Sequence, residues 1–279
     1  MTTPLADWQE VADGVWVRRY AELDLTVGLV VGEQRCLVID TRGDAVQGAE
    51  LAAAVRELTP LPWAVAITHA HFDHAFGTSA FGPCEVWAQE GCRATLVAEG
   101  AASRAAWARR YRDEGKPEIA DAIAATELVF PQRLVAREAE LSLGGRRVRL
   151  AHFGPGHTGH DLVVHVPDVA VVFAGDLLER GPEDTYTEES FGRDTVLESW
   201  PAALDGIRAL RPRVVVPGHG DPAGPGFLDR QRRVLGELAA LRAGVAAGEL
   251  SPQEALARSP LPEPVTRSAL AGAAGFSRT

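Results

Sequence analysis

The residues of this chain that could do chemistry are histidines and aspartates, and most of them fall in one short segment. Residues 68–74 read T-H-A-H-F-D-H, so three of the chain's eight histidines lie within this segment, next to an aspartate. Imidazole nitrogens and carboxylate oxygens are the ligands that zinc and similar divalent ions prefer. A compact turn after a strand can direct alternate side chains to one ion and the intervening ones to a second. The segment therefore predicts a metal site with a low risk of a chance match.

Three later segments carry the same residue types. His157 lies in G-P-G-H-T-G-H (154–160), Asp176 ends F-A-G-D (173–176), and His219 lies in V-P-G-H-G (216–220). Each is expected directly after a strand, where open α/β folds bind their ligands. The neighbouring glycines permit close approach of the backbone and left-handed turns. The predicted metal ligands are His69, His71, Asp73, His74, His157, Asp176 and His219.

Alternating short apolar runs and helical patterns predict the elements that position these residues. Strands are expected over 15–20, 25–32, 36–41, 63–68, 134–138, 146–153, 162–167, 169–175 and 213–218. Helices are expected over 45–58, 196–210 and 226–247, with two more in 89–128 separated by a break near Gly115–Pro117. The stretch from Pro252 onward is rich in Pro, Ala and Ser and predicts a loose end. We expect a single domain over 1–279, with a core at about 10–225 and a helical C-terminal appendage at about 226–279.

Composition excludes several classes of protein. Hydrophobic residues make up 46% and charged residues 24% of 279 residues, as in globular proteins, and the net charge is -10. An acidic chain is a poor partner for nucleic acid or for an anionic membrane surface. No apolar run reaches the ~20 residues of a membrane span, and the N-terminus does not resemble a signal peptide. Cys36, Cys84 and Cys92 form no CxxC pair, which favours reduced thiols and, with the other signals, a cytoplasmic protein. We expect a small molecule as its substrate.

The motifs H-x-H-x-D-H (69–74), G-H-T-G-H (156–160), A-G-D (174–176) and G-H-G (218–220) resemble, in this order, those of the metallo-β-lactamase superfamily. The resemblance spans about residues 10–225. It implies an α/β fold, a four-layer αββα sandwich of two mixed β-sheets flanked by helices. It implies two divalent ions, zinc by preference, with iron or manganese as alternatives. His69, His71 and His157 would hold the first ion and Asp73, His74 and His219 the second, with Asp176 bridging them.

Two ions held in this way predict a hydrolase. A hydroxide bridging the ions would attack an ester, thioester, lactone or amide-type bond, with Asp73 as the catalytic residue that orients it and passes on its proton. The chain has no GxSxG motif, which favours direct attack by water. Three alternatives stay open: a mononuclear iron enzyme like the persulfide dioxygenases, a β-lactamase proper, and a catalytically silent metal-binding protein. The superfamily's branches that act on glutathione thioesters or RNA, or that carry a flavodoxin domain, are disfavoured by the short C-terminal part, the charge and the length.

For other polar and aromatic residues, both a structural and a functional role are possible from the sequence. For His152 and His165 we favour a structural role, and for His160 a structural or ligand-supporting one. Asp40, at a strand end, could orient a ligand imidazole or cap a turn. The remaining candidates are Trp107 and Tyr111, expected to pack rather than to form a lid, and Tyr186, Phe191 and Arg193, expected in a solvated loop over 180–193.

Overall fold

The apolar runs of the sequence become the strands of two mixed β-sheets in the computed structural model, which describes residues 7–271. The first sheet has seven strands in chain order, antiparallel from β1 to β4 and parallel from β4 to β7. These strands are β1 (Trp8–Ala12), β2 (Val15–Arg19), β3 (Thr26–Val31), β4 (Cys36–Ile39), β5 (Trp63–Ala66), β6 (Val86–Gln89) and β7 (Arg133–Val135).

The second sheet has five strands in the order β12-β11-β10-β9-β8. Only β11 and β12 run parallel in it. Its strands are β8 (Glu138–Ser142), β9 (Arg147–Ala151), β10 (Val163–Val166), β11 (Val171–Glu179) and β12 (Val214–His219). The expected strand over 134–138 is therefore wrong: the chain leaves the first sheet after Val135 and enters the second at Glu138. A single β-rich run in the sequence cannot reveal a change of sheet.

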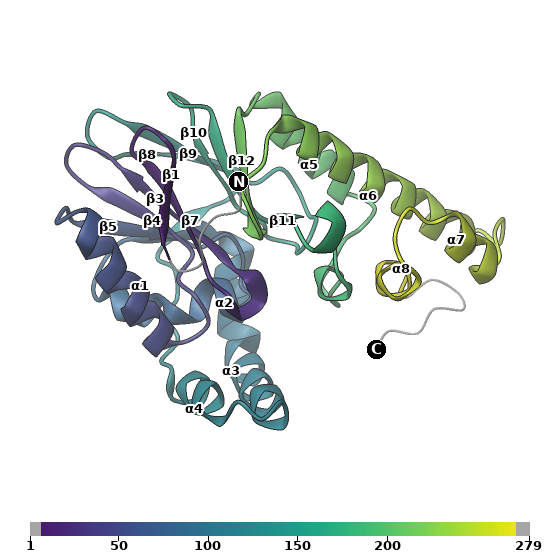
Figure 1. Ribbon diagram of the computed structural model, residues 1–279, viewed down its shortest axis with the longest axis horizontal. Coiled ribbons are helices and arrows are strands. Elements are labelled where there is room, and N and C mark those ends of the chain that lie inside the picture. The colour runs from purple at the N-terminus through teal and green to yellow at the C-terminus, as the bar shows by residue number, and fades with distance from the viewer. Residues whose placement is uncertain (1–6, 272–279) are drawn as a thin grey trace.

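The helices cover the two outer faces of the sheets, which produces the expected αββα sandwich (Figure 1). On the side of the first sheet lie α1 (Ala45–Leu58), α2 (Phe72–Ala75), α3 (Glu90–Asp113) and α4 (Pro117–Ala125). On the side of the second sheet lie α5 (Trp200–Ala209) and α6 (Pro225–Ala246), followed by α7 (Pro252–Arg258) and α8 (Glu263–Ala269). No helix of residues 7–271 is long and apolar enough to cross a bilayer.

Three apolar layers hold the sandwich together. Val17 and Leu37 of the first sheet pack with Val148 and Val164 of the second in the central layer. A second layer joins the first sheet to α1 and α3, and a third joins β10 and β11 to α5 and α6. Since each sheet is covered on both faces, its strands read as continuous apolar runs in the sequence.

Local signals explain where the helices begin and end. The Asp44 side chain accepts a hydrogen bond from Gln47 N at 2.8 Å and so caps α1, which has the predicted bounds. The helix α3 ends at Asp113, and Gly115 follows in the left-handed region with φ +75°. Pro117 then begins α4 two residues later. The predicted break near these two residues is confirmed.

The C-terminal part is packed more closely than predicted. Phe227 and Leu235 of α6 lie in the same core layer as α5 and β11. Beyond Pro252, Leu261 and Ala269 join that layer, and Ala255 is fully buried against α6. The expectation of a loose end is therefore wrong over 252–271, because these two short helices bury apolar side chains. The rest of that stretch, 272–279, lies outside the described residues.

Candidate metal centre

All seven predicted ligand residues meet at one edge of the sandwich. His69, His71, Asp73 and His74 lie in the loop after β5 and in α2, and His157 lies in the loop after β9. His219 was expected directly after a strand and is the last residue of β12. Asp176 was expected after a strand end but lies inside β11, which continues to Glu179. The register of β11 shifts on both sides of Gly175, whose φ is +54°, and this bulge turns the Asp176 carboxylate into the site.

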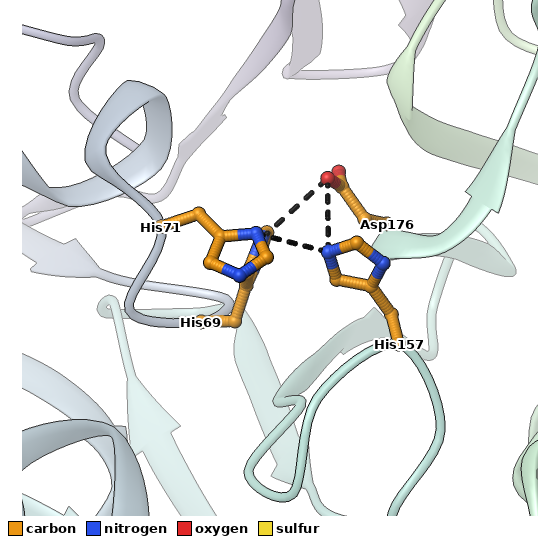
Figure 2. Close-up of side chains that lie close together, drawn as sticks. All are labelled: His69, His71, His157 and Asp176. Atoms are coloured by element: carbon orange, nitrogen blue, oxygen red, sulfur yellow. Dashed lines mark hydrogen bonds and ion pairs between the residues drawn. The ribbon is translucent and has the colours of Figure 1, made fainter. Parts of the chain in front are cut away.

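The first group contains His69, His71, His157 and Asp176, with one ligand atom of each lying within 4.8 Å of all the others. Figure 2 shows the three imidazoles and the carboxylate converging on one point. His157 Nε2 is 3.0 Å from His71 Nδ1, and Asp176 Oδ2 is 3.5 Å from both His69 Nε2 and His157 Nε2. Three nitrogens and one oxygen at this spacing could hold one tetrahedral ion.

The second group contains Asp73, His74 and His219, also within 4.8 Å of one another. Asp73 Oδ2 lies 3.5 Å from His74 Nε2 and 3.4 Å from His219 Nε2. Asp176 reaches this group too, since its Oδ1 is 3.2 Å from His74 Nε2 and its Oδ2 is 3.3 Å from His219 Nε2. One carboxylate therefore lies between two sets of ligand atoms, each of which could hold an ion.

The polar atoms of this centre fit a cation. His69 Nε2 and Asp176 Oδ1 are buried, and neither has a hydrogen-bond partner. A buried polar atom without a partner is costly unless something else satisfies it. Five imidazoles and two carboxylates with facing lone pairs would find that partner in divalent ions.

Electrostatics at the centre favour positive charge between these residues. Burial lowers the pKa of His157 to about 4, so its ring is neutral at pH 7 and offers a lone pair. Burial alone would raise the pKa of Asp176, but the His74, His219 and His69 imidazoles hold it well below its usual range. Burial would also lower the pKa of His219, yet Asp176 and Asp73 raise it to about 10. The carboxylates thus stabilise a cation here, whether proton or metal.

Each of the five imidazoles is fixed by a hydrogen bond through the nitrogen that faces away from its group. Asp40 accepts from His74 Nδ1 at 2.8 Å and from the Thr68 hydroxyl at 2.9 Å. The Thr68 oxygen is then left to accept from His69 Nδ1, 3.0 Å away. The buried Asp40 carboxylate thereby orients one imidazole of each group, His74 directly and His69 through Thr68. This supports the role of Asp40 in orienting a ligand imidazole rather than in capping a turn. His157 Nδ1 donates to the Ser190 carbonyl at 3.1 Å and His219 Nδ1 to the Leu23 carbonyl at 2.8 Å.

Two carboxyl groups near the metal centre were not predicted from the sequence. Asp194 accepts from His71 Nε2 at 3.1 Å, across 123 residues of sequence. Glu179 is buried and accepts from the Ser190 hydroxyl at 2.7 Å, and burial together with the charge of Asp176 raises its pKa to about 8. Glu179 follows Asp176 by three residues on β11, and this proximity in sequence is the feature that could have indicated it. Asp194 lies one residue beyond the loop singled out in the sequence.

The remaining histidines do not join either group. His165 is buried in β10, and His152 Nδ1 donates to the Asp161 carbonyl at 2.8 Å. His160 Nε2 accepts from Ala70 N at 3.2 Å, which ties the loop of His157 to the loop of His69. These contacts agree with the structural roles expected for His152 and His165 and with a ligand-supporting role for His160.

A cavity of about 1140 Å³ opens beside the two groups, between α3 and the loop over 181–194. Tyr111 is buried, while Trp107 stacks on Phe72 at 4.0 Å between ring centroids and also lines the cavity. The expectation of a solvated loop is wrong for Tyr186 and Phe191, which are 1% and 8% exposed and pack around Trp200. These aromatic anchors hold the loop. Arg193 is exposed and lines the cavity.

A substitution at Gly218 can test the position of the Asp176 carboxylate without changing any candidate ligand. A Cβ at this position would lie 1.8 Å from Asp176 Oδ1 and 3.0 Å from the Gly175 carbonyl carbon. We expect Gly218→Ala to displace the Asp176 carboxylate and to weaken divalent-ion binding by on the order of 10- to 100-fold, measured by competition with a chromophoric chelator. Gly224→Ala is the matched control, because a Cβ there meets nothing within 4 Å. Equal affinities in the two variants would contradict the described position of Asp176.

Comparisons with known proteins agree with this architecture. The family model described as the metallo-beta-lactamase superfamily matches residues 23–219. The chain is 24% identical over 220 residues to a linear primary-alkylsulfatase of Pseudomonas sp. (strain ATCC 19151), covering 70% of this chain and 41% of the relative. It is 28% identical over 112 residues to the metallo-beta-lactamase type 2 of Bacteroides fragilis, covering 39% and 44%. The chain therefore spans less than half the length of these curated relatives.

Solved structures share the fold at low sequence identity. A metallo-beta-lactamase from Pontibacter korlensis superposes with a TM-score of 0.62 at 20% identity, over 82% of this chain and 98% of that chain. The sec-alkylsulfatase Pisa1 from Pseudomonas sp. superposes with a TM-score of 0.74 at 16% identity, over 95% of this chain and 47% of that chain. With the family model covering most of the sandwich and all four motifs in place, the chain belongs to the metallo-β-lactamase superfamily.

Proposed function

We propose that this chain is a metal-dependent hydrolase that holds two divalent ions, zinc by preference, and cleaves an ester, thioester, lactone or amide-type bond of a small molecule. The observation that carries the proposal is the position of Asp176. Its buried carboxylate lies within 3.5 Å of imidazole nitrogens of both groups, and its Oδ1 has no hydrogen-bond partner. A carboxylate in this position suits a bridge between two ions.

Different residues of the centre would bind the ions, transfer the proton and orient the ligands. When bound, the ions supply an activated water and Lewis-acid stabilisation of the bond under attack. His69, His71 and His157 would hold one ion, and Asp73, His74 and His219 would hold the other. Asp73 also lines the cavity, so its carboxylate can take the proton of the attacking water and pass it to the leaving group. Asp40 and Asp194 keep the imidazoles in the orientation that ligation needs.

A mononuclear iron enzyme is less well supported than a dinuclear hydrolase. A non-haem iron site of the two-histidine, one-carboxylate type needs only three ligands and leaves positions open. Here Asp73, His74 and His219 form a complete second set, fixed by Asp40 and by the Leu23 carbonyl. A single ion in the first group would leave Asp73, His74 and His219 without an ion to hold.

The test is metal analysis joined to a substrate panel. Full-length protein purified without chelator is expected to contain about two divalent ions per chain, by mass spectrometry, and to hydrolyse at least one member of the panel. The panel contains carboxylic esters, thioesters, lactones and β-lactams, with a sulfate ester added because one relative is named as an alkylsulfatase. Chelation should abolish turnover, and zinc should restore it. Saturating metal should raise Tm by roughly 8 °C, since 1,000-fold excess over Kd contributes about 4 kcal/mol.

Three outcomes would contradict the proposal. About one iron per chain with oxygen uptake on glutathione persulfide would favour the dioxygenase alternative. Two bound ions without turnover of any panel member would favour a silent metal-binding protein. Turnover that survives chelation would remove the metals from the reaction altogether.

A further inference from the structure

A row of alanines forms part of the wall that α3 contributes to the cavity. Ala98, Ala102 and Ala106 follow one another at i, i+4 and i+8, so they lie on one face of this helix, and all three are exposed and line the cavity. Over these eight residues the helix rises about 12 Å. No side chain longer than a methyl group projects from this stripe, which leaves an elongated space alongside it.

This space is continuous with the metal centre. His71, Asp73, His157 and Asp176 line the same cavity as the alanine stripe. Asp176, which is 5% exposed and whose Oδ1 has no hydrogen-bond partner, belongs to this shared lining. At about 1140 Å³, the cavity is somewhat larger than the roughly 300–1,000 Å³ typical of small-molecule pockets. A substrate whose reacting bond lies at the metals therefore has room for a long substituent.

Aromatic side chains form part of the other walls of the cavity. Phe72 and Trp107 stack on each other beside the ligand loop, and Phe191 lines the opposite side. Arg110 of α3 lies over the Trp107 ring, 4.7 Å from its centroid, and forms an ion pair with Glu189 of the facing loop and a second with Glu114 at 2.9 Å. The charged lining residues Glu99, Arg109, Glu188 and Arg193 are exposed, so their ends can stay in water, whereas Asp73, Asp176 and Glu179 are buried at the metal centre. The alanine stripe and the aromatic rings thus suit an uncharged hydrocarbon.

We propose that the substrate is an ester or thioester that carries an extended saturated chain, and that this chain lies along Ala98, Ala102 and Ala106. The inference rests on the proposed hydrolase function. Burial of each additional methylene group contributes up to about fourfold in affinity or in kcat/KM. A compact bicyclic substrate would leave the stripe uncovered.

The experiment measures dependence on chain length in the metal-loaded full chain. Values of kcat/KM for p-nitrophenyl esters from acetate to decanoate are expected to rise by at least about tenfold over the series. Binding of the free carboxylates from acetate to decanoate, followed by calorimetry, should show the same trend without any hydrolysis.

Two matched variants of α3 locate the chain. Ala102→Trp fills the stripe and should reduce the decanoate-to-acetate ratio of kcat/KM, and of affinity, by on the order of tenfold. Ala105→Trp places the same ring on an exposed position outside the cavity lining and should leave both ratios unchanged. Circular dichroism and Tm check that both variants fold.

The outcomes separate this inference from the proposed function. Metal-dependent hydrolysis with equal kcat/KM for acetate and decanoate, or equal effects of the two tryptophans, would overturn the chain-binding inference and leave the hydrolase intact. Chain-length-dependent binding that Ala102→Trp removes, without turnover of any ester, would support chain binding and count against hydrolysis. Equal affinity for acetate and decanoate overturns the inference in either case.

Discussion

Replacing Asp176 with asparagine is expected to leave this protein with about one ion per chain and to reduce turnover by on the order of 1,000-fold. Asparagine keeps the shape of the side chain but removes the negative charge that lies between both groups of ligands. The Lewis-acid contribution of an ion is several kcal/mol, and each ~1.4 kcal/mol is tenfold in rate. Mass spectrometry of the metal content and kcat of the same preparation measure both effects.

The buried carboxyl of Glu179 provides a control for Asp176. It lies on the same strand and near His157, but it belongs to neither group of ligand atoms. Glu179→Gln should therefore keep two ions, because the amide can still accept from the Ser190 hydroxyl. If Asp176→Asn also kept two ions at wild-type affinity, the bridging role would be wrong.

Replacing Asp73 is expected to have the second largest effect, and two variants separate its two proposed roles. Asp73→Ala removes a ligand of the second group and should lower both the second ion's occupancy and turnover. Asp73→Asn keeps an oxygen that can reach an ion but cannot accept a proton as a carboxylate does. We expect this variant to retain most of the second ion and to lose on the order of 100- to 1,000-fold in kcat, the range of general acid–base catalysis.

The comparison that matters is kcat against metal content, measured on the same samples. A decrease in kcat of Asp73→Asn that matches the loss of metal would assign Asp73 to ligation alone. Wild-type turnover of Asp73→Ala with two bound ions would exclude Asp73 from both roles.

Much of the fold was predictable because its signals are local. The bounds of α1 follow from the Asp44 cap and from an apolar face that ends before Pro60. The strands read as apolar runs because both faces of each sheet are covered. The switch between sheets after Val135 was not predictable, since the two halves of the run pair with different strands, β6 for one and β9 for the other, and the run itself does not show which. For the same reason Asp176 was expected at a strand end, whereas β11 continues beside β12 past a bulge.

The sequence alone determined the types and order of the candidate ligands. His69, His71, Asp73 and His74 lie within one turn and a short helix, so their neighbourhood is set by the chain itself. The partners of these residues were decided by the tertiary structure. Asp194 contacts His71 from 123 residues away, and the alanines on α3 line one cavity with the loop over 181–194 and the metal centre. Contacts of this kind depend on how the two sheets place their loops, and no local pattern of residue types encodes that placement.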